Sequence, residues 1–94
     1  MRLRYLTGAL KDLRLIIEYI ARDNHAAACR VIAAIRKEAQ ALIEHPQLGR
    51  SGQIEGTREL AHGRYPFIIA YRVQGDEIQI LGGVHTPRKW PEDF

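Results

Sequence analysis

The stretch that decides the fold runs Arg64-Tyr-Pro-Phe-Ile-Ile-Ala-Tyr-Arg-Val-Gln-Gly-Asp-Glu-Ile-Gln-Ile-Leu-Gly-Gly-Val-His85. It holds two apolar runs rich in β-branched residues, Phe67–Val73 and Glu77–Val84, on either side of Gly75-Asp76. Runs of this composition that flank a two-residue Gly-Asp turn predict a β-hairpin. The chain before this stretch has mainly helical patterns, and the chain after it is a short tail with two prolines. We therefore expect the hairpin to form the centre of the fold.

The turn at Gly75-Asp76 sets the pairing of the two strands, and so the face on which each side chain lies. It pairs Gln74 with Glu77, and an unbroken register then continues to Phe67 opposite Val84. Side chains alternate between the two faces along a strand. The larger and more apolar set is expected to pack on the helices, and it comprises Phe67, Ile69, Tyr71, Val73, Ile78, Ile80 and Val84. The other set forms an open face of Ile68, Ala70, Arg72, Gln79, Leu81, Gly83 and His85.

The chain before the hairpin predicts a strand, two helices and a further short strand. Arg2–Leu6 alternates polar and apolar residues, Thr7 offers a helix N-cap, and residues 57–62 suit a short strand. Between them, apolar residues recur every three or four positions in two stretches, as in amphipathic helices. These two stripes are Leu10, Leu13, Ile16, Ile17 and Ile20, and then Ala28, Ile32, Ile35, Ala39, Leu42 and Ile43.

Together these elements predict one α+β domain that spans residues 1–94. In it a small antiparallel sheet, made of the N-terminal strand and a C-terminal three-stranded meander, packs in two layers on an antiparallel helix pair. The first helix ends near Asp23-Asn24-His25 and the second at His45-Pro46, because the residue before a proline disfavours helix. Residues 46–56, which are rich in glycine, are expected to form a surface loop.

Composition limits the compartment and the kind of partner. The chain has 94 residues, a formal net charge of +3 and a sequence pI of about 9.4, which favours an anionic partner, either nucleic acid or an acidic protein. The lone Cys29 cannot form an intramolecular disulfide and is expected to be a small buried residue of the second helix. The start resembles no signal peptide, and no apolar run reaches the roughly 20 residues of a membrane span. We expect a cytoplasmic protein without membrane contact.

The residues that could carry chemistry are mostly basic. Phosphate-loop, Cys-x-x-Cys, His-Glu-x-x-His and Gly-x-Ser-x-Gly motifs are all absent from the sequence, so we expect no metal and no cofactor. Metal-free cleavage of a phosphodiester needs cations that hold the phosphate and a group that exchanges protons near neutral pH. The alternative is that Arg72 and Arg88 pair with acidic groups, in this chain or in a partner, and that His85 is structural. The candidates are Arg58, His62, Arg64, Arg72, His85, Arg88 and Lys89, with Trp90 beside them.

Several motifs, taken together, resemble the RelE/ParE superfamily of bacterial toxins from about Leu6 to Pro91. They are the first apolar stripe with Tyr19-Ile20, then His45-Pro-Gln-Leu-Gly-Arg50, Gly56-Thr-Arg-Glu-Leu60, Tyr65-Pro-Phe-Ile-Ile-Ala-Tyr-Arg-Val73 and Ile80-Leu-Gly-Gly-Val-His85. The resemblance implies a growth-inhibiting cytoplasmic toxin of a type II toxin–antitoxin system. It also implies a cognate antitoxin that wraps and silences the toxin, and a small antiparallel sheet backed by two helices.

The superfamily divides by mechanism, and the motifs favour one branch. RelE-like members cut mRNA on the ribosome and place an arginine at the position of Ile68, whereas ParE-like members inhibit DNA gyrase. The ending His85-Thr-Pro-Arg-Lys-Trp-Pro91 looks like the ParE-like ending. We therefore favour a ParE-like gyrase inhibitor with no committed catalytic residue. The first alternative is a RelE-like, ribosome-dependent mRNA endonuclease that uses His85, Arg58 and Arg64. The second, of another class, is a basic nucleic-acid-binding module.

The antitoxin is expected to cover the open face, where apolar side chains have no helix of their own above them. A helix or strand of the antitoxin, with apolar anchors and acidic groups that meet Arg72 or Arg88, would fit this surface and give a hetero-oligomer. The residues expected to contact the antitoxin or the target are Ile68, Arg72, Leu81, His85, Arg88 and Trp90.

Overall fold

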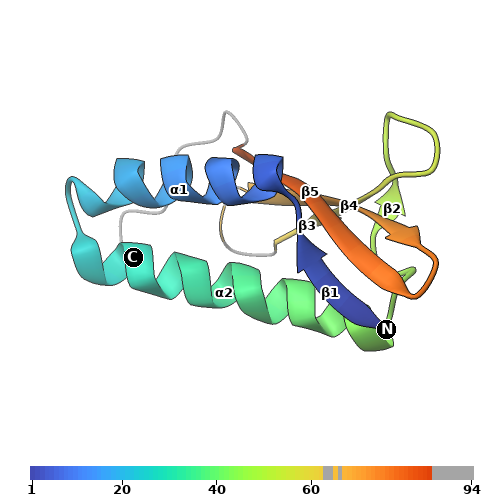
Figure 1. Ribbon diagram of the computed structural model, residues 1–94. Coiled ribbons are helices and arrows are strands. Elements are labelled where there is room, and N and C mark those ends of the chain that lie inside the picture. The colour runs from blue at the N-terminus through green and yellow to red at the C-terminus, as the bar shows by residue number, and fades with distance from the viewer. Residues whose placement is uncertain (63–64, 66, 86–94) are drawn as a thin grey trace.

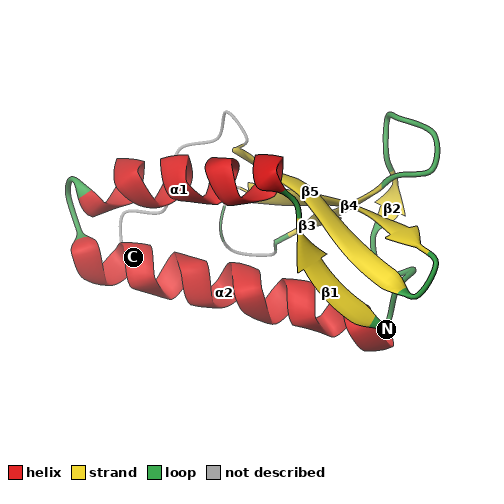
Figure 2. Ribbon diagram, viewed as in Figure 1, coloured by secondary structure: helices red, strands yellow, loops and turns green. Residues whose placement is uncertain are grey.

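The computed structural model describes residues 1–62, 65 and 67–85, without the side chains of residues 83–85. It confirms the α+β class: two helices pack against one five-stranded sheet (Figures 1 and 2). The elements in chain order are β1 (Arg2–Tyr5), α1 (Thr7–Ala21), α2 (His25–Glu44), β2 (Arg50–Ser51), β3 (Arg58–Ala61), β4 (Phe67–Gln74) and β5 (Glu77–His85).

The sheet is mixed rather than wholly antiparallel, which corrects one part of the expectation. Its strand order is β1-β5-β4-β3-β2, and β1 pairs with β5 in parallel, with Arg2 opposite Glu77 and Tyr5 opposite Ile80. Parallel strands need a long connection, and the two helices and the remaining strands supply it. The two-residue β2 lies inside the expected surface loop and extends the antiparallel edge beside β3.

The hairpin forms as predicted near its turn, but its register changes half-way along. Gln74 to Tyr71 pair with Glu77 to Ile80 as expected. Between Ala70 and Tyr71 the register shifts, so Ala70 lies opposite Gly82 instead of Leu81, and Phe67 lies opposite His85 instead of Val84. A β-bulge, which sets two residues of one strand against one of the other, gives this shift. The predicted unbroken register, and with it the face assignment beyond Leu81, is therefore wrong.

The bulge lies beside a close approach of α1 to the sheet. A Cβ atom on Gly82 would lie 2.7 Å from Oδ2 of Asp12 on α1, and a Cβ on Gly8 would lie 3.2 Å from the Leu81 carbonyl oxygen. Glycine at these two positions lets the backbone of β5 and the start of α1 pack together.

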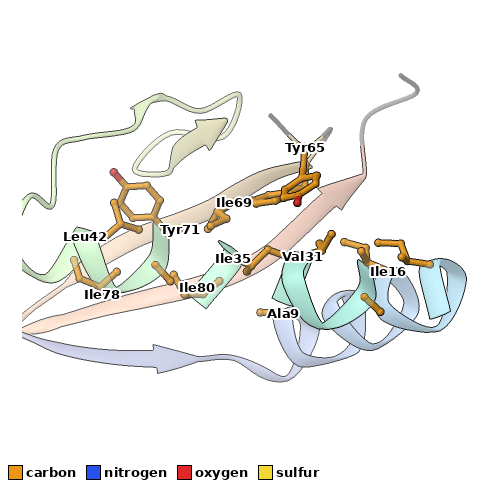
Figure 3. Close-up of a cluster of buried hydrophobic side chains, with 14 of the residues drawn as sticks. Ala9, Ile16, Val31, Ile35, Leu42, Tyr65, Ile69, Tyr71, Ile78 and Ile80 are labelled. Carbon is orange, nitrogen blue, oxygen red and sulfur yellow. The ribbon is translucent and has the colours of Figure 1, made fainter. Parts of the chain in front are cut away.

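The core lies between the helices and the hairpin, as the alternation predicts (Figure 3). The predicted inward-facing set is buried at five of its positions, Phe67, Ile69, Tyr71, Ile78 and Ile80. The helices contribute to the same core Ala9, Ile16, Ile20, Ala27, Ala28, Val31, Ile35, Ala39 and Leu42.

Asn24 caps α2, because its side chain accepts a hydrogen bond of 3.0 Å from the Ala27 N–H.

Four expectations about single residues are wrong. Leu10 lies at the edge of the first stripe and is 56% exposed, while Val73 lies near the turn and is 41% exposed. Cys29 is exposed, because it follows the buried stripe of α2 by one position. The N-cap of α1 is Leu6 without a side-chain bond, so Thr7 already belongs to the helix.

Candidate functional site: the open face of the sheet

The open face is the side of the sheet opposite the helices, and the observed pairing decides which residues lie on it. Cross-strand partners share a face, so Arg4 of β1, Gln79 of β5 and Arg72 of β4 form one row across the sheet. A second row runs from Ala70 through Glu59 to Arg50. The open face, as the described side chains define it, thus has an apolar centre with charged groups on both flanks.

Polar side chains on β1, β4 and β5 form one connected network. The Arg72 Nε–H donates to Gln79 Oε1 at 2.8 Å, and the Gln79 amide donates to Glu77 Oε1 at 2.9 Å. Glu77 also forms ion pairs with Arg2 at 3.5 Å and Arg4 at 3.8 Å. Gln79 is only 6% exposed, although it lies on the open face, because these neighbours cover it. The network fixes the Arg72 guanidinium over the sheet.

Arg72 was a candidate for pairing with an acidic group in this chain or in a partner, and no such pair within the chain is formed among the described residues. Among the described residues, its side-chain bond is to the neutral Gln79, and Glu77 is reached only through that amide. The Arg72 charge is therefore not neutralised by direct contact with a described carboxylate. This leaves an exposed guanidinium that is oriented and can meet an acid from outside.

The apolar centre of the open face comes from Ile68, Ala70 and Leu81, which are all half-buried. Ile68 lies opposite Ala61 of β3 and Val84 of β5, so no cation occupies the middle of this surface at its position. Glu59 beside Ala70 forms an ion pair of 3.7 Å with Arg50 at the sheet edge. The surface combines a small apolar patch with fixed charges at its rim.

Arg58 does not join this face. It lies opposite Tyr71, on the helix side of the sheet, where its Nη1 donates to the Gly49 carbonyl oxygen at 2.7 Å. The buried Tyr71 hydroxyl accepts from the Gly49 N–H and donates to the Pro46 carbonyl oxygen, both at 2.8 Å. Arg58 and Tyr71 thus anchor the loop before β2, and Arg58 and Arg72 lie on opposite faces of the sheet.

Other candidates from the sequence fall outside the open face or outside the described residues. Arg64, Arg88, Lys89 and Trp90 lie outside the described residues, and of His85 only the backbone, paired with Phe67, is described. Sequence reasoning missed Arg2, Arg4, Arg50 and Glu77 as members of the surface. The alternation of Arg2-Leu-Arg-Tyr5 would have indicated Arg2 and Arg4, but only if the parallel pairing of this strand with β5 had been known.

His62 belongs to a separate cluster at the end of β3. Its Nδ1 accepts from the Tyr65 N–H at 2.9 Å, so a neutral ring carries its proton on Nε2, which lies 3.7 Å from Glu38 Oε1 of α2. The ring stacks on Tyr65 with 5.2 Å between centroids and lies 4.8 Å from the ring of Phe67. This geometry ties the sheet to α2 and gives His62 a structural position on the helix side.

Comparisons with known proteins identify the family of the chain. Residues 3–90 match the family model described as the ParE toxin of the type II toxin–antitoxin system, parDE. The chain belongs to the ParE toxin family. This toxin is also 42% identical over 91 residues to a Sinorhizobium fredii protein named "Putative toxin Y4kP", covering 97% of this chain and 94% of that protein.

Solved structures give the same assignment for the fold. The toxin matches a structure of the chromosomal ParDE system of P. aeruginosa with a TM-score of 0.81 and 29% identity, over 92% of this chain and 96% of that one. It matches the RelBE2 toxin–antitoxin complex of Mycobacterium tuberculosis with a TM-score of 0.65 and 24% identity, over 89% and 95% of the two chains. The second match concerns the fold alone.

No three side chains of His, Cys, Asp or Glu within residues 1–62, 65 and 67–82 gather into a group that could hold a metal ion. Neither of the two helices is long and apolar enough to cross a membrane.

Proposed function

We propose that this toxin inhibits DNA gyrase and that a cognate antitoxin silences it by covering the open face of the sheet. The first support is the family, because the match over residues 3–90 is to the ParE toxin. ParE-like members are the branch of the superfamily that is expected to inhibit gyrase. The P. aeruginosa relative is described as part of a ParDE toxin–antitoxin system, which supports an antitoxin partner here.

The chemistry of the open face favours action by binding rather than by RNA cleavage. The described cations of this face are arginines, which stay protonated and do not exchange protons near neutral pH. The observation that carries the proposal is the position of Arg58, one of the residues that the endonuclease alternative would use. Instead, Arg58 holds the Gly49 carbonyl on the helix side of the sheet, and the apolar Ile68 occupies the centre of the open face.

The same face has the properties of a protein-binding surface. Its half-buried apolar centre can take aliphatic anchors of a partner, while Arg72 offers an oriented cation to a partner's carboxylate. Arg2, Arg4 and Arg50 surround the centre, although each forms an ion pair with a nearby acid. We propose that an acidic, amphipathic segment of the antitoxin lies here, with Ile68 and Leu81 beneath it.

The test is a direct comparison of the two activities with purified toxin. Gyrase supercoiling of relaxed plasmid is measured in parallel with the integrity of a translated mRNA in a reconstituted translation system. We expect inhibition of supercoiling, relief by the antitoxin, and intact mRNA. Cleavage of the translated mRNA together with undisturbed supercoiling would refute the proposal and establish the endonuclease alternative.

A further inference from the structure

Gln79 of β5 is the only polar residue in the described part of the toxin that is buried, although it lies on the open face. It stands in the middle of a row that crosses three strands, between Arg4 of β1 and Arg72 of β4 (Figure 1). A buried amide needs hydrogen-bond partners for both its oxygen and its nitrogen, because an unsatisfied polar group is costly. The partners of Gln79 therefore indicate its role.

The two ends of the Gln79 amide meet groups of opposite kinds. Its nitrogen donates to Glu77 Oε1 at 2.9 Å, and its oxygen accepts from the Arg72 Nε–H at 2.8 Å. An ionised carboxylate can only accept hydrogen bonds, and a guanidinium can only donate them. The amide is therefore confined to one orientation, because a reversed amide would lose both bonds.

Glu77 is itself held in place from the edge of the sheet. Its carboxylate lies 3.5 Å from the Arg2 guanidinium and 3.8 Å from that of Arg4, and its side chain is only 18% exposed. These arginines lie beside Glu77 and Gln79 because β1 pairs in parallel with β5. A series of contacts thus runs from β1 through β5 to Arg72 on β4.

The bond to Gln79 uses one of the five N–H donors of the Arg72 guanidinium. No described residue accepts a hydrogen bond from Nη1 or Nη2 of Arg72, and the residue is exposed. These two nitrogens form the edge of a guanidinium that can bind a carboxylate through two parallel hydrogen bonds, a strong and geometrically specific arrangement. The bond through Nε fixes the direction of the guanidinium and leaves this edge available to a partner.

The neutral charge of Gln79 matters as much as its position. Glu77 is paired with the arginines of β1, and Glu59 is paired with Arg50. No described carboxylate lies within ion-pair distance of Arg72. A glutamate at position 79 could also orient the guanidinium, but it would cancel its charge. An amide orients the guanidinium and leaves the full charge to an acid from outside the chain.

We infer that Gln79 is the positioning residue of the proposed antitoxin surface, and that it directs the Nη1–Nη2 edge of Arg72 towards a carboxylate of the antitoxin. The inference rests on the proposed function for the identity of the partner. It adds that recognition depends on the direction of the guanidinium as well as on its charge. Substitution of Gln79, which is only 6% exposed, should therefore weaken the complex through Arg72.

A double-mutant cycle with the purified cognate antitoxin separates positioning from a general effect on the sheet. Calorimetry compares the unmodified toxin with Gln79→Met, Arg72→Ala and the double variant. We expect Gln79→Met to weaken binding by about two- to tenfold, the range of one hydrogen bond, and to have no further effect once residue 72 is alanine. An equal loss in both backgrounds would overturn the inference, because Gln79 would then act through the fold alone.

Two controls accompany the cycle. Gln40→Met makes the same exchange at an exposed position of α2 and should leave the affinity unchanged. Far-UV circular dichroism checks that each variant is folded. In the free toxin, the Arg72 Nε–H should exchange with water faster in Gln79→Met than in the unmodified chain, which tests the hydrogen bond without the antitoxin.

Gln79→Glu tests the importance of a neutral side chain at this position. Its carboxylate would pair with Arg72 inside the chain, so this variant should weaken antitoxin binding at least as much as Gln79→Met. An affinity equal to that of the unmodified toxin would overturn the inference.

The outcomes distinguish this inference from the proposed function. If Arg72→Ala left the affinity unchanged, the proposed antitoxin surface would be refuted, and the role of Gln79 with it. If Arg72→Ala weakened binding and Gln79→Met did not, the antitoxin surface would stand and the positioning role of Gln79 alone would be refuted.

Discussion

Replacing Tyr71 by phenylalanine removes one hydroxyl from the buried contact between the sheet and the loop before β2. Tyr71 is 0% exposed, and its hydroxyl makes two hydrogen bonds of 2.8 Å, from the Gly49 N–H and to the Pro46 carbonyl. A buried donor left without a partner costs about 1–3 kcal/mol, and the second bond contributes about 1 kcal/mol. We therefore expect Tyr71→Phe to lower the free energy of unfolding by about 2–4 kcal/mol, a large part of the stability of a small domain.

Urea unfolding followed by far-UV circular dichroism measures this loss, and exchange of the Gly49 amide hydrogen locates it. That amide should exchange faster in the variant, because its acceptor is gone. Tyr5→Phe is the matched control: the Tyr5 ring packs on the same core, and no described residue forms a hydrogen bond with its hydroxyl. It should change stability by less than about 0.5 kcal/mol. A Tyr71→Phe variant as stable as the unmodified toxin would refute the anchoring role of this hydroxyl.

Three further predictions concern other parts of the chain. Gly49→Ala places a Cβ 2.8 Å from the buried Tyr71 ring, so it should lower the free energy of unfolding in urea by about 1–3 kcal/mol. The Cβ of Gly82→Ala meets only the movable carboxylate of Asp12, so this variant should lose less stability. Burial raises the pKa of Tyr5 above 10.0, and the nearby charge of Arg36 lowers this pKa by a smaller amount. The folded toxin therefore holds this proton more tightly, so stability should fall as the pH rises through 10.0, and less so in Tyr5→Phe. Arg72→Glu should weaken antitoxin binding measured by calorimetry, whereas Lys11→Glu, a charge reversal on α1, should leave it unchanged. If the Arg72→Glu variant and the unmodified toxin bound the antitoxin with equal affinity, the proposed antitoxin surface would be contradicted.

Local patterns in the sequence predicted the parts of the fold that depend on local rules. The spacing of apolar residues located both helices, and Gly75-Asp76 located the turn and the register up to Tyr71 opposite Ile80. The bulge at Leu81 could not be predicted in this way. It lies beside Gly82, which Asp12 of α1 approaches closely although the two residues are about 70 positions apart in the sequence.

The candidate site was predictable only in part, for the same reason. Alternation correctly placed Ile68 and Arg72 on the open face. Both belong to β4, and alternation within one strand does not depend on how that strand pairs with its neighbours. The sequence does not show that Arg58 faces the loop, since its partner Gly49 is brought there by Tyr71. Likewise, Arg2 and Arg4 join the surface only because β1 pairs in parallel with β5.

The central claim is that this ParE-family toxin acts on gyrase and not on mRNA, and one measurement in cells tests it most directly. After the toxin is induced, plasmid supercoiling and incorporation of labelled amino acids are followed in the same culture, with co-induced antitoxin as the control. We expect plasmids to lose negative supercoiling before protein synthesis declines. Protein synthesis that stops first, while plasmids remain fully supercoiled, would contradict it.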